Sequence, residues 1–482
     1  MAFKLFGALL VATTLCTSSS QQATVDQNDI EALKAHVANL EARVQEKMKL
    51  KSSGDPRELA AHEAGIQNAS TTLFLLASGA LVMFMQAGFA ILEAGSVTKK
   101  NTGIVLLKNL IDVCVGTLAW YFLGFGIAYG IADDPSNAVG SKNFAAGDFL
   151  ETDSEDKISG STFFRDWFFQ WAFCATAATI VSGGVAERMA LPSYVLYSIV
   201  MTGVIYPFVV YWTWSGEGWL TMGPNDDEVD GYSDFAGSGI VHLVGGVGAL
   251  TGAILLGPRK GRFERPDDFK PCNGAMVVLG TFILWFGWYG FNCGSQLSMA
   301  SEEDGVYASL VAMNSTLAAS AGGITVFFLR LAQTCGKEYD MTGMCNGILA
   351  GLVAICAGVA VVEPSMAMVT GALGGIFQEI GHLLVLALKI DDPLDAFAVH
   401  GMGGICGMLT RPLFDWTGAK ESLFGWHLAA LAAIWAWTMG WSIVIMLPLK
   451  LLKLLRISDA EETTGGDVHL AHSPVKPYEA AS

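Results

Sequence analysis

Charged residues are scarce in this sequence. Only 15% of the 482 residues are Asp, Glu, Lys or Arg, whereas 52% are hydrophobic, and the mean hydropathy is +0.44. A soluble domain carries far more charge on its surface, so this composition excludes an ordinary soluble protein. The 55 glycines fit a membrane protein, because small residues let helices approach closely where lipid supplies no hydrophobic driving force.

Basic residues are the rarer of the two charged kinds. The chain has 28 Lys and Arg against 45 Asp and Glu, a net charge of −17, which gives no support to a nucleic-acid partner. Paired cysteines are also missing, since the nine cysteines stand singly, without metal-ligand spacing or the framework of a secreted domain. We therefore expect no metal site and no cofactor, and we interpret the cysteines as small core residues.

Long apolar segments dominate what the sequence does contain. From Thr72 onward, about eleven segments are long enough to cross a hydrocarbon core of roughly 30 Å. Their approximate ranges are 72–95, 104–130, 167–186, 193–214, 235–257, 274–293, 309–330, 343–362, 366–389, 394–412 and 424–449. The sequence therefore predicts an all-α polytopic membrane protein, with a membrane domain over residues 71–451.

The N-terminal 70 residues differ from this pattern. Residues 1–20 have a basic start, a short apolar run and then small residues, which is the layout of a secretory signal peptide; the alternative is an uncleaved anchor helix. In residues 21–70, expected to be extracellular, apolar side chains recur at spacings of three and four, which predicts either a short heptad helix or a single amphipathic helix. These side chains belong to Ile30, Leu33, Val37, Leu40 and Val44.

Candidate modification sites flank the predicted membrane domain. Asn68 begins an Asn-Ala-Ser tripeptide just before the first span and is a candidate N-glycosylation site. Residues 452–482 form the predicted tail, in which Ser458, Thr463 and Thr464 are candidate phosphorylation sites. A phosphate there would add negative charge and could undock the tail from the bundle.

Basic and acidic loops alternate along the predicted spans. The loops on one side hold most Lys and Arg residues, including the cluster from Arg259 to Lys270, and the positive-inside rule makes this side cytoplasmic. The opposite loops are acidic. Eleven spans then place the N-terminus outside and the C-terminus in the cytoplasm, and we expect the protein in the plasma membrane.

One Asp-to-His segment occurs twice in apolar surroundings. His242 follows Asp234 by eight positions, and His400 follows Asp392 by eight positions. On a continuous helix eight residues rise roughly 12 Å, so each histidine would lie near the bilayer midplane. An odd number of spans per half predicts a five-plus-five inverted repeat plus an eleventh helix, with both histidines meeting in a central pore. The alternative is two histidines that form separate hydrogen bonds at helix contacts.

Aromatic residues gather at the predicted outer ends of three spans. They lie in the segments 169–173, 212–214 and 286–291. Ring faces attract cations by about 0.5 to 2 kcal/mol. Trp and Tyr also line membrane interfaces without any binding role, so the clusters alone do not define a site.

Taken in order, several motifs between about 70 and 458 resemble those of the ammonium transporter (Amt/Mep/Rh) family, most closely its plant and algal members. The motifs are Gln86–Ala90, Gly95–Val97, Lys100–Thr102, Ala186–Arg188, Asp234–His242, Gly287–Ser295 and Asp391–Gly401. The resemblance implies a homotrimer with one pore per subunit. Two features depart from the family pattern: the N-terminal segment is longer than usual, and the phosphorylatable threonine expected near Gly466–His469 is absent.

The resemblance also implies roles for individual residues. The substrate-binding residues would be Phe173, Trp214, Ser295 and Asp234. The pore gate would be formed by Phe173 and Phe291. The pore would be lined by His242 and His400, with supporting carboxylates at Asp392 and Asp395.

We therefore expect an ammonium transporter that recruits NH4+ at an external aromatic site, deprotonates it and conducts NH3 past the histidines, with separate proton transfer. Its partners would be ammonium and ammonia, with methylammonium as an alternative substrate, and the lipid bilayer. An uncoupled ammonia gas channel would use the same residues. An ammonium sensor is disfavoured because residues 452–482 are too few for a catalytic signalling domain. An enzyme is disfavoured because neither histidine has a nearby Ser or Cys nucleophile or a metal-ligand cluster.

Overall fold

The computed structural model describes residues 56–131, 138–147, 149, 162–223, 231–417 and 422–470, with scattered residues between 31 and 43. The chain divides into two compact units, Met1–Gln67 and Asn68–Ser482. The predicted signal peptide lies outside the described residues, as do Ile30, Leu33, Leu40 and Val44 of the heptad pattern. Val37 is described and exposed in a helical segment.

The first part of the membrane unit consists of long helices and π-helical turns. In order, these are α3 (Pro56–Ser96), α4 (Thr102–Ala119), η2 (Trp120–Gly124), α5 (Phe125–Tyr129), α6 (Phe163–Val185), α7 (Leu191–Val200), η4 (Met201–Ile205), α8 (Tyr206–Trp214), α9 (Trp219–Met222), η5 (Ser238–Leu243) and α10 (Val244–Leu256). The π-helical turns η2 and η4 continue their neighbours, so residues 102–129 and 191–214 each form one continuous rod.

The second part repeats this organisation and ends in a tail. Its helices are α11 (Gly274–Gly294), α12 (Glu302–Gln333), α13 (Met341–Ile355), α14 (Pro364–Ala387), η7 (Phe397–Met402), α15 (Gly403–Phe414), α16 (Ser422–Leu451), α17 (Asp459–Thr464) and the 3-10 turn η8 (Gly466–His469). Both Asp-to-His segments therefore enter their helix through a π-helical turn that contains the histidine, His242 in η5 and His400 in η7.

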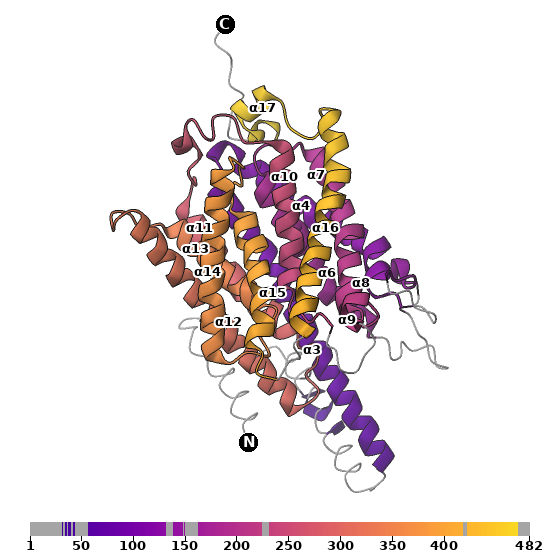
Figure 1. Ribbon diagram of the computed structural model, residues 1–482. Helices are drawn as coiled ribbons and strands as arrows, with labels where there is room; N and C mark the ends of the chain where they lie inside the picture. The colour runs from indigo at the N-terminus through magenta and orange to yellow at the C-terminus, as the bar shows by residue number, and fades with distance from the viewer. Residues whose placement is uncertain are drawn as a thin grey trace, which may run out of the picture. The chain divides into compact units, whose positions relative to one another are not determined.

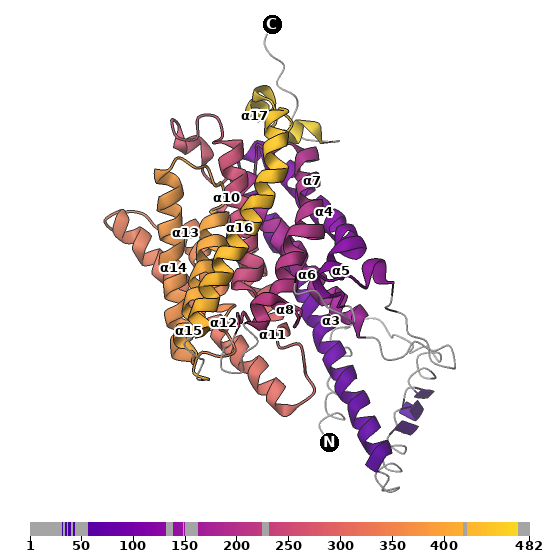
Figure 2. The same cartoon turned by 45° about the vertical axis from the view of Figure 1, so that its right-hand side comes forward.

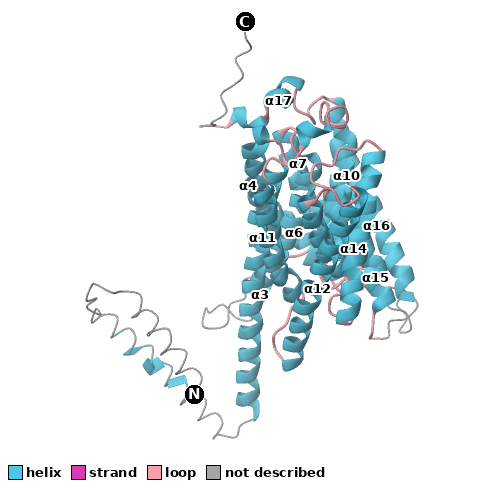
Figure 3. Ribbon diagram, turned by 90° about the vertical axis from the view of Figure 1, so that its left-hand side faces the viewer, coloured by secondary structure: helices cyan, strands magenta, loops and turns pink. Residues whose placement is uncertain are grey.

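The spans predicted from the sequence are present in the described residues. Nine helical segments there are long and apolar enough to cross a membrane, and Met341–Ile355 is a shorter apolar helix. With η7 and α15, they make the eleven predicted segments. Figure 3 shows the helices side by side with the loops gathered at their ends. The protein is an all-helical, multi-pass membrane protein.

Small residues bring the helices of the second half together. α12, α13 and α14 contact one another along their lengths. A Cβ atom added to Gly371 of α14 would lie 2.2 Å from the carbonyl oxygen of Ala318 in α12, and one added to Gly351 of α13 would lie 2.3 Å from the same oxygen. Backbones that approach this closely admit no side chain, which confirms the role inferred for the abundant glycines.

The tail lies at one end of the bundle, which we call the tail side. In Figure 1, α17 lies beyond the ends of α4, α7 and α10. The last long helix, α16, contacts both α7 and α10 on its way to this end, as the turned view in Figure 2 shows. The C-terminal segment therefore meets helices from the first part of the chain.

Candidate functional site

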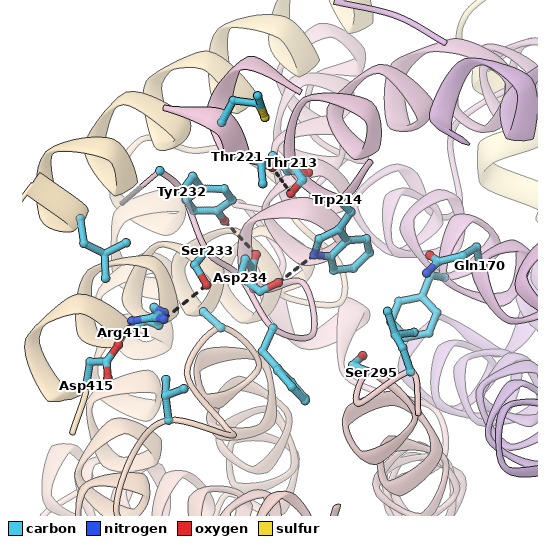
Figure 4. A pocket seen from close by; sticks show the side chains of 18 of the residues that line it. Gln170, Thr213, Trp214, Thr221, Tyr232, Ser233, Asp234, Ser295, Arg411 and Asp415 are labelled. Carbon is cyan, nitrogen blue, oxygen red and sulfur yellow. Dashed lines mark hydrogen bonds and ion pairs between the residues drawn. The ribbon is translucent and has the colours of Figure 1, made fainter. Parts of the chain in front are cut away.

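A cavity of about 700 Å³ opens at the end of the bundle opposite the tail, and we call it the aromatic cavity. Its lining includes four predicted site residues: Phe173, Trp214, Asp234 and Ser295. Figure 4 shows Trp214 between Asp234 and the side of the cavity that carries Gln170 and Ser295. Phe173 lies in α6, Trp214 ends α8, and Ser295 directly follows α11.

Two stacked phenylalanines close the floor of the aromatic cavity. The rings of Phe173 and Phe291 are 4.1 Å apart between centroids and inclined by 26°. Trp214 meets Phe173 edge-on at 6.0 Å. Phe291 also stacks on His242, at 5.4 Å between centroids. Phe173 lines the cavity and Phe291 contacts His242, so the two rings lie between the cavity and the histidines.

Trp214 and Ser295 are held in place by hydrogen bonds that leave their ligand-facing groups available. The Trp214 Nε1 donates to the backbone carbonyl of Asp234 at 2.8 Å, so the ring face remains free of this bond. The Ser295 hydroxyl donates to the carbonyl of Phe291 at 2.9 Å. With its hydrogen used in that way, the Ser295 oxygen offers lone pairs to a donor in the cavity.

The carboxylate of Asp234 is occupied by groups of the protein itself. Oδ1 accepts from the backbone N–H groups of Gly237 and Ser238 at 2.9 and 3.0 Å. Oδ2 accepts from the N–H groups of Gly239 and Ile240 at 2.8 and 3.3 Å and from the Tyr232 hydroxyl at 2.8 Å. These bonds satisfy the first N–H groups of η5, which have no partner within the helix. Asp234, only 5% exposed, therefore caps η5 and fixes Trp214 through its carbonyl.

An ion pair that the sequence reasoning missed also lines the aromatic cavity. Arg411 and Asp415 form a salt bridge there, and Arg411 Nη2 donates to the Ser233 hydroxyl at 3.3 Å. A lone guanidinium would repel a cation, and Asp415 offsets that charge. The two residues are four apart at the end of α15, but no sequence feature indicated that this helix end reaches the cavity.

The two predicted histidines meet beneath the phenylalanines. Their Nδ1 atoms are 3.2 Å apart, and the rings are inclined by only 20°. His242 also stacks on Trp288, and its Nε2 has no hydrogen-bond partner. When both rings are neutral, one Nδ1 donates and the other accepts, so a single hydrogen lies between them. The direct contact rules out the alternative of two separately bonded histidines.

Both Asp-to-His segments begin their helices later than predicted. The expected spans 235–257 and 394–412 begin at Ser238 and Phe397, because the preceding residues fold back to present a capping carboxylate. Asp392 accepts from the N–H groups of Ala396 and Phe397 at 3.0 and 2.8 Å, as Asp234 does for η5. The rise of roughly 12 Å expected for a continuous helix therefore does not apply to either segment.

Asp395 has a different environment from Asp392. Its Oδ1 lies 2.7 Å from His382 Nδ1, and its Oδ2 accepts from Asn346 Nδ2 at 2.9 Å. Asp395 thus joins α13 and α14 to the segment before His400. The sequence reasoning did not select His382 or Asn346, because nothing in their own segments indicates a partner about 13 or 49 positions away.

A small cavity of about 30 Å³, the histidine cavity, lies on the other side of His400. His400 and Glu93 are the titratable residues in its lining. Glu93, with Lys108 and Asp112 of α4, is almost fully buried and was also missed. The sequence could have indicated these residues, because all three are ionisable residues inside predicted membrane spans, where such residues are rare and usually functional.

An ion cluster on the tail side joins two of the motifs, Ala186–Arg188 and Asp391–Gly401, through Arg259. Arg259 Nε and Nη2 donate to Asp391 at 2.8 and 3.0 Å, and its Nη1 pairs with Glu187. Arg188 donates to the Asp391 carbonyl at 2.6 Å. Burial alone would raise the pKa of Asp391, but the hydrogen bonds and charge of Arg259 outweigh it and hold that pKa at about 2.

The tail docks against the same side. Asp467 accepts from the N–H groups of Gly103 and Ile104 at 3.0 and 2.8 Å, which caps the start of α4. Arg456 donates to the carbonyls of Leu256 and Pro258, both at 2.8 Å, and pairs with Glu462. The described part of the tail, up to Leu470, thus packs against the bundle.

The candidate modification sites are also placed. Ser458 is the N-cap of α17 and accepts from the Glu461 N–H, and the Thr463 and Thr464 hydroxyls donate to carbonyls one turn back. Asn68 lies within α3, exposed, and its Oδ1 accepts from Arg165 at 2.6 Å. Phosphorylation and glycosylation themselves stay predictions.

Comparison with known proteins gives one consistent result. The sequence model of the Ammonium Transporter Family matches residues 73–473. Ammonium transporter 1 member 3 of Solanum lycopersicum is 37% identical over 84% of this chain and 93% of its own length. Ammonium transporter Amt2 of Archaeoglobus fulgidus is 38% identical over 82% of this chain and 86% of its own length. A solved structure named Sensor Amt Protein superposes with a TM-score of 0.74 at 32% identity, covering 83% of this chain and 98% of that one. The chain belongs to the ammonium transporter family, whose members are membrane transporters and not enzymes.

Proposed function

We propose that this protein is an electrogenic ammonium transporter that recruits NH4+ in the aromatic cavity and passes NH3 and a proton separately along the histidines. The observation that carries the proposal is the stack of Phe173 and Phe291, which lies between the cation-attracting cavity and the contacting histidine pair. A hydrated ion cannot pass two rings in contact, so the ion must lose water, and then a proton, before nitrogen moves on.

Recruitment uses the groups that the hydrogen bonds leave free. The Trp214 and Phe173 rings provide an attraction of about 0.5 to 2 kcal/mol each, and the Ser295 oxygen accepts an N–H of the ion. Asp234 acts as a positioning residue, because its carboxylate oxygens are already filled by five donors. K+ binds at the same rings but has no proton to release, so it stops in the aromatic cavity.

Proton release follows from desolvation. Removing water disfavours the charged form of an amine, so ammonium that enters the floor of the cavity shifts toward NH3. The neutral molecule then travels past Phe291 to the histidines. The hydrogen shared between the two Nδ1 atoms lets the pair accept a proton at one ring and release one at the other.

The orientation and assembly belong to the same proposal. Arg188, Arg259 and Arg456 gather on the tail side, which supports a cytoplasmic tail and an extracellular aromatic cavity. The curated relatives are named ammonium transporters, and we extend that substrate to this chain, with methylammonium as an analogue. We further propose a homotrimer in the plasma membrane with one pore per subunit.

The test is current recording in cells that express the protein, with ammonium, methylammonium and K+ compared. Wild type should carry current with ammonium and none with K+. Replacing His242 and His400 together with Asn should abolish the ammonium current, because Asn cannot titrate, while binding in the aromatic cavity persists. Undiminished ammonium-selective current in the double variant would show that charge does not cross by way of the histidines. Ammonia flux without current in wild type would favour the gas channel.

A further inference from the structure

The histidine cavity has one carboxylate in its wall. Glu93 of α3 lines this space together with His400, and its side chain is 2% exposed. A buried water needs about 10 to 15 Å³ of such volume, so a cavity of about 30 Å³ accommodates roughly two. The cavity therefore has room for one or two waters beside His400 and Glu93.

Glu93 is held in a fixed orientation by two neighbouring helices. The Ser182 hydroxyl of α6 lies 2.5 Å from both carboxylate oxygens, and Asn109 Nδ2 of α4 donates to Oε2 at 3.1 Å. An ionisable group is costly in a membrane interior and is usually retained for function. This carboxylate is thus fixed, but it still faces the cavity that His400 shares.

The other charged groups around Glu93 already have partners elsewhere. Lys108 of α4 donates to the Met189 carbonyl at 2.8 Å. Asp112, also of α4, accepts from the Ser198 hydroxyl at 2.5 Å and from the Tyr194 hydroxyl. Neither Lys108 nor Asp112 lines the histidine cavity. Glu93 is therefore the carboxylate placed to exchange a proton with His400.

A second space lies beyond Glu93 on the tail side. This tail pocket, of about 660 Å³, is lined by Lys108 and Met189 and by tail residues that include Arg456 and Ser458. Lys108 is the chain neighbour of Asn109, which binds Glu93. Two adjacent residues of α4 therefore contact Glu93 and line the tail pocket, respectively.

We propose that Glu93 receives the proton that leaves His400 and passes it to water in the tail pocket, while NH3 crosses the histidine cavity as a neutral molecule. This inference rests on the proposed function. An N–H bond of the His400 imidazolium breaks as an O–H bond forms on Glu93 through cavity water. The O–H bond of Glu93 then breaks and the proton enters the tail pocket. One NH3 and one H+ cross per ammonium ion, and both side chains return to their starting charge.

The test separates the two movements in proteoliposomes. Ammonium-driven current is recorded on a solid-supported membrane. NH3 that enters without a proton is detected in stopped-flow measurements as a rise of the internal pH. Glu93→Gln keeps the size of the side chain and both hydrogen-bonding neighbours but cannot take up a proton. General acid–base groups contribute about a hundredfold or more, so the current should fall at least about tenfold. NH3 that then enters without its proton should alkalinise the vesicle interior more than wild type does, because wild type delivers NH3 and H+ together. Glu93→Asp should restore part of the current.

Asp112→Asn is the matched control, since it also neutralises a buried carboxylate but one outside the histidine cavity. It should keep its current, and all variants should elute as wild type in size-exclusion chromatography. Full current in Glu93→Gln, equal losses of current in Glu93→Gln and Asp112→Asn, or a loss of current in Glu93→Gln without alkalinisation above that of wild type would each overturn the role of Glu93. If Glu93→Gln does not elute as wild type, the current of Glu93→Asp is the test instead. A current no higher than background in Glu93→Asp would then also overturn the role of Glu93. Failure of the proposed function itself would appear separately, as an absence of current in wild type.

Discussion

Replacement of Asp234 by Asn tests whether this carboxylate holds the architecture or binds the ion. Asn offers one acceptor oxygen and one NH2 group where Asp offers two oxygens. In either orientation of the amide, two backbone N–H groups lose their acceptor: those of Gly239 and Ile240, or those of Gly237 and Ser238. The Tyr232 hydroxyl can rotate and accept from the new NH2 group.

The expected cost follows from these two buried donors. Each unsatisfied buried N–H costs about 1 to 3 kcal/mol, so Asp234→Asn should destabilise the folded transporter by about 2 to 6 kcal/mol. Asp392→Asn is the matched comparison, because that carboxylate caps η7 with only the Ala396 and Phe397 N–H groups. It should leave one donor unpaired and cost about 1 to 3 kcal/mol.

The assay is the thermal midpoint of detergent-solubilised protein, followed by size-exclusion chromatography after heating, together with the KM for ammonium. The midpoint should fall for both variants and fall further for Asp234→Asn. A midpoint equal to that of wild type, combined with a raised KM in Asp234→Asn, would refute the reasoning. The carboxylate would then act on the ion directly.

Three further predictions address the tail side and the N-terminal segment. The pKa of Asp391 is lowered from 3.8 to about 2, so its ion pair should contribute about 2 kcal/mol to the free energy of unfolding. This contribution is fully present above about pH 4 and is lost as the pH falls toward about 2. Measuring the thermal midpoint of wild type against pH checks this, and Asp391→Asn should lack the dependence. Asp467→Ala should release the tail from the start of α4 and lower transport without lowering surface expression, and unchanged flux would show that docking does not influence transport. Leu33→Asp with Leu40→Asp should weaken the oligomer if the heptad pattern forms a helix between subunits, and undiminished detergent stability of the oligomer would favour the single amphipathic helix.

The membrane helices could be predicted from the sequence because each carries its own signal. Apolar length marks a span without reference to its neighbours, and the repeated Asp-to-His spacing marked both capped helices. The start of those helices could not be predicted, because the choice between a helix that continues to Asp234 and a side chain that caps Ser238 depends on local packing. The contact of His242 with His400 was expected from the repeat, and the structure confirms it.

The missed residues fall into two kinds. Glu93 and Lys108 were visible as charges within predicted spans, so a direct reading of intramembrane ionisable residues would have found them. The pairs Arg411 with Ser233 and His382 with Asp395 were not visible, because each joins segments that only the packed bundle brings together. Long-range partners of this sort require coordinates.

Because a single hydrogen lies between His242 and His400, a proton can pass along the pair in only one direction at a time. The ring that donates through Nδ1 has a bare Nε2, and the other ring carries its hydrogen on Nε2. A proton that enters at the bare end and leaves at the other end reverses this arrangement, so the entry end then holds a hydrogen and accepts no second proton. Rotation of His242 is obstructed, since its ring is stacked against both Trp288 and Phe291. In a pair that relays protons, both rings must therefore return to their starting tautomers before the next proton can pass, and this return is an obligatory step of every cycle.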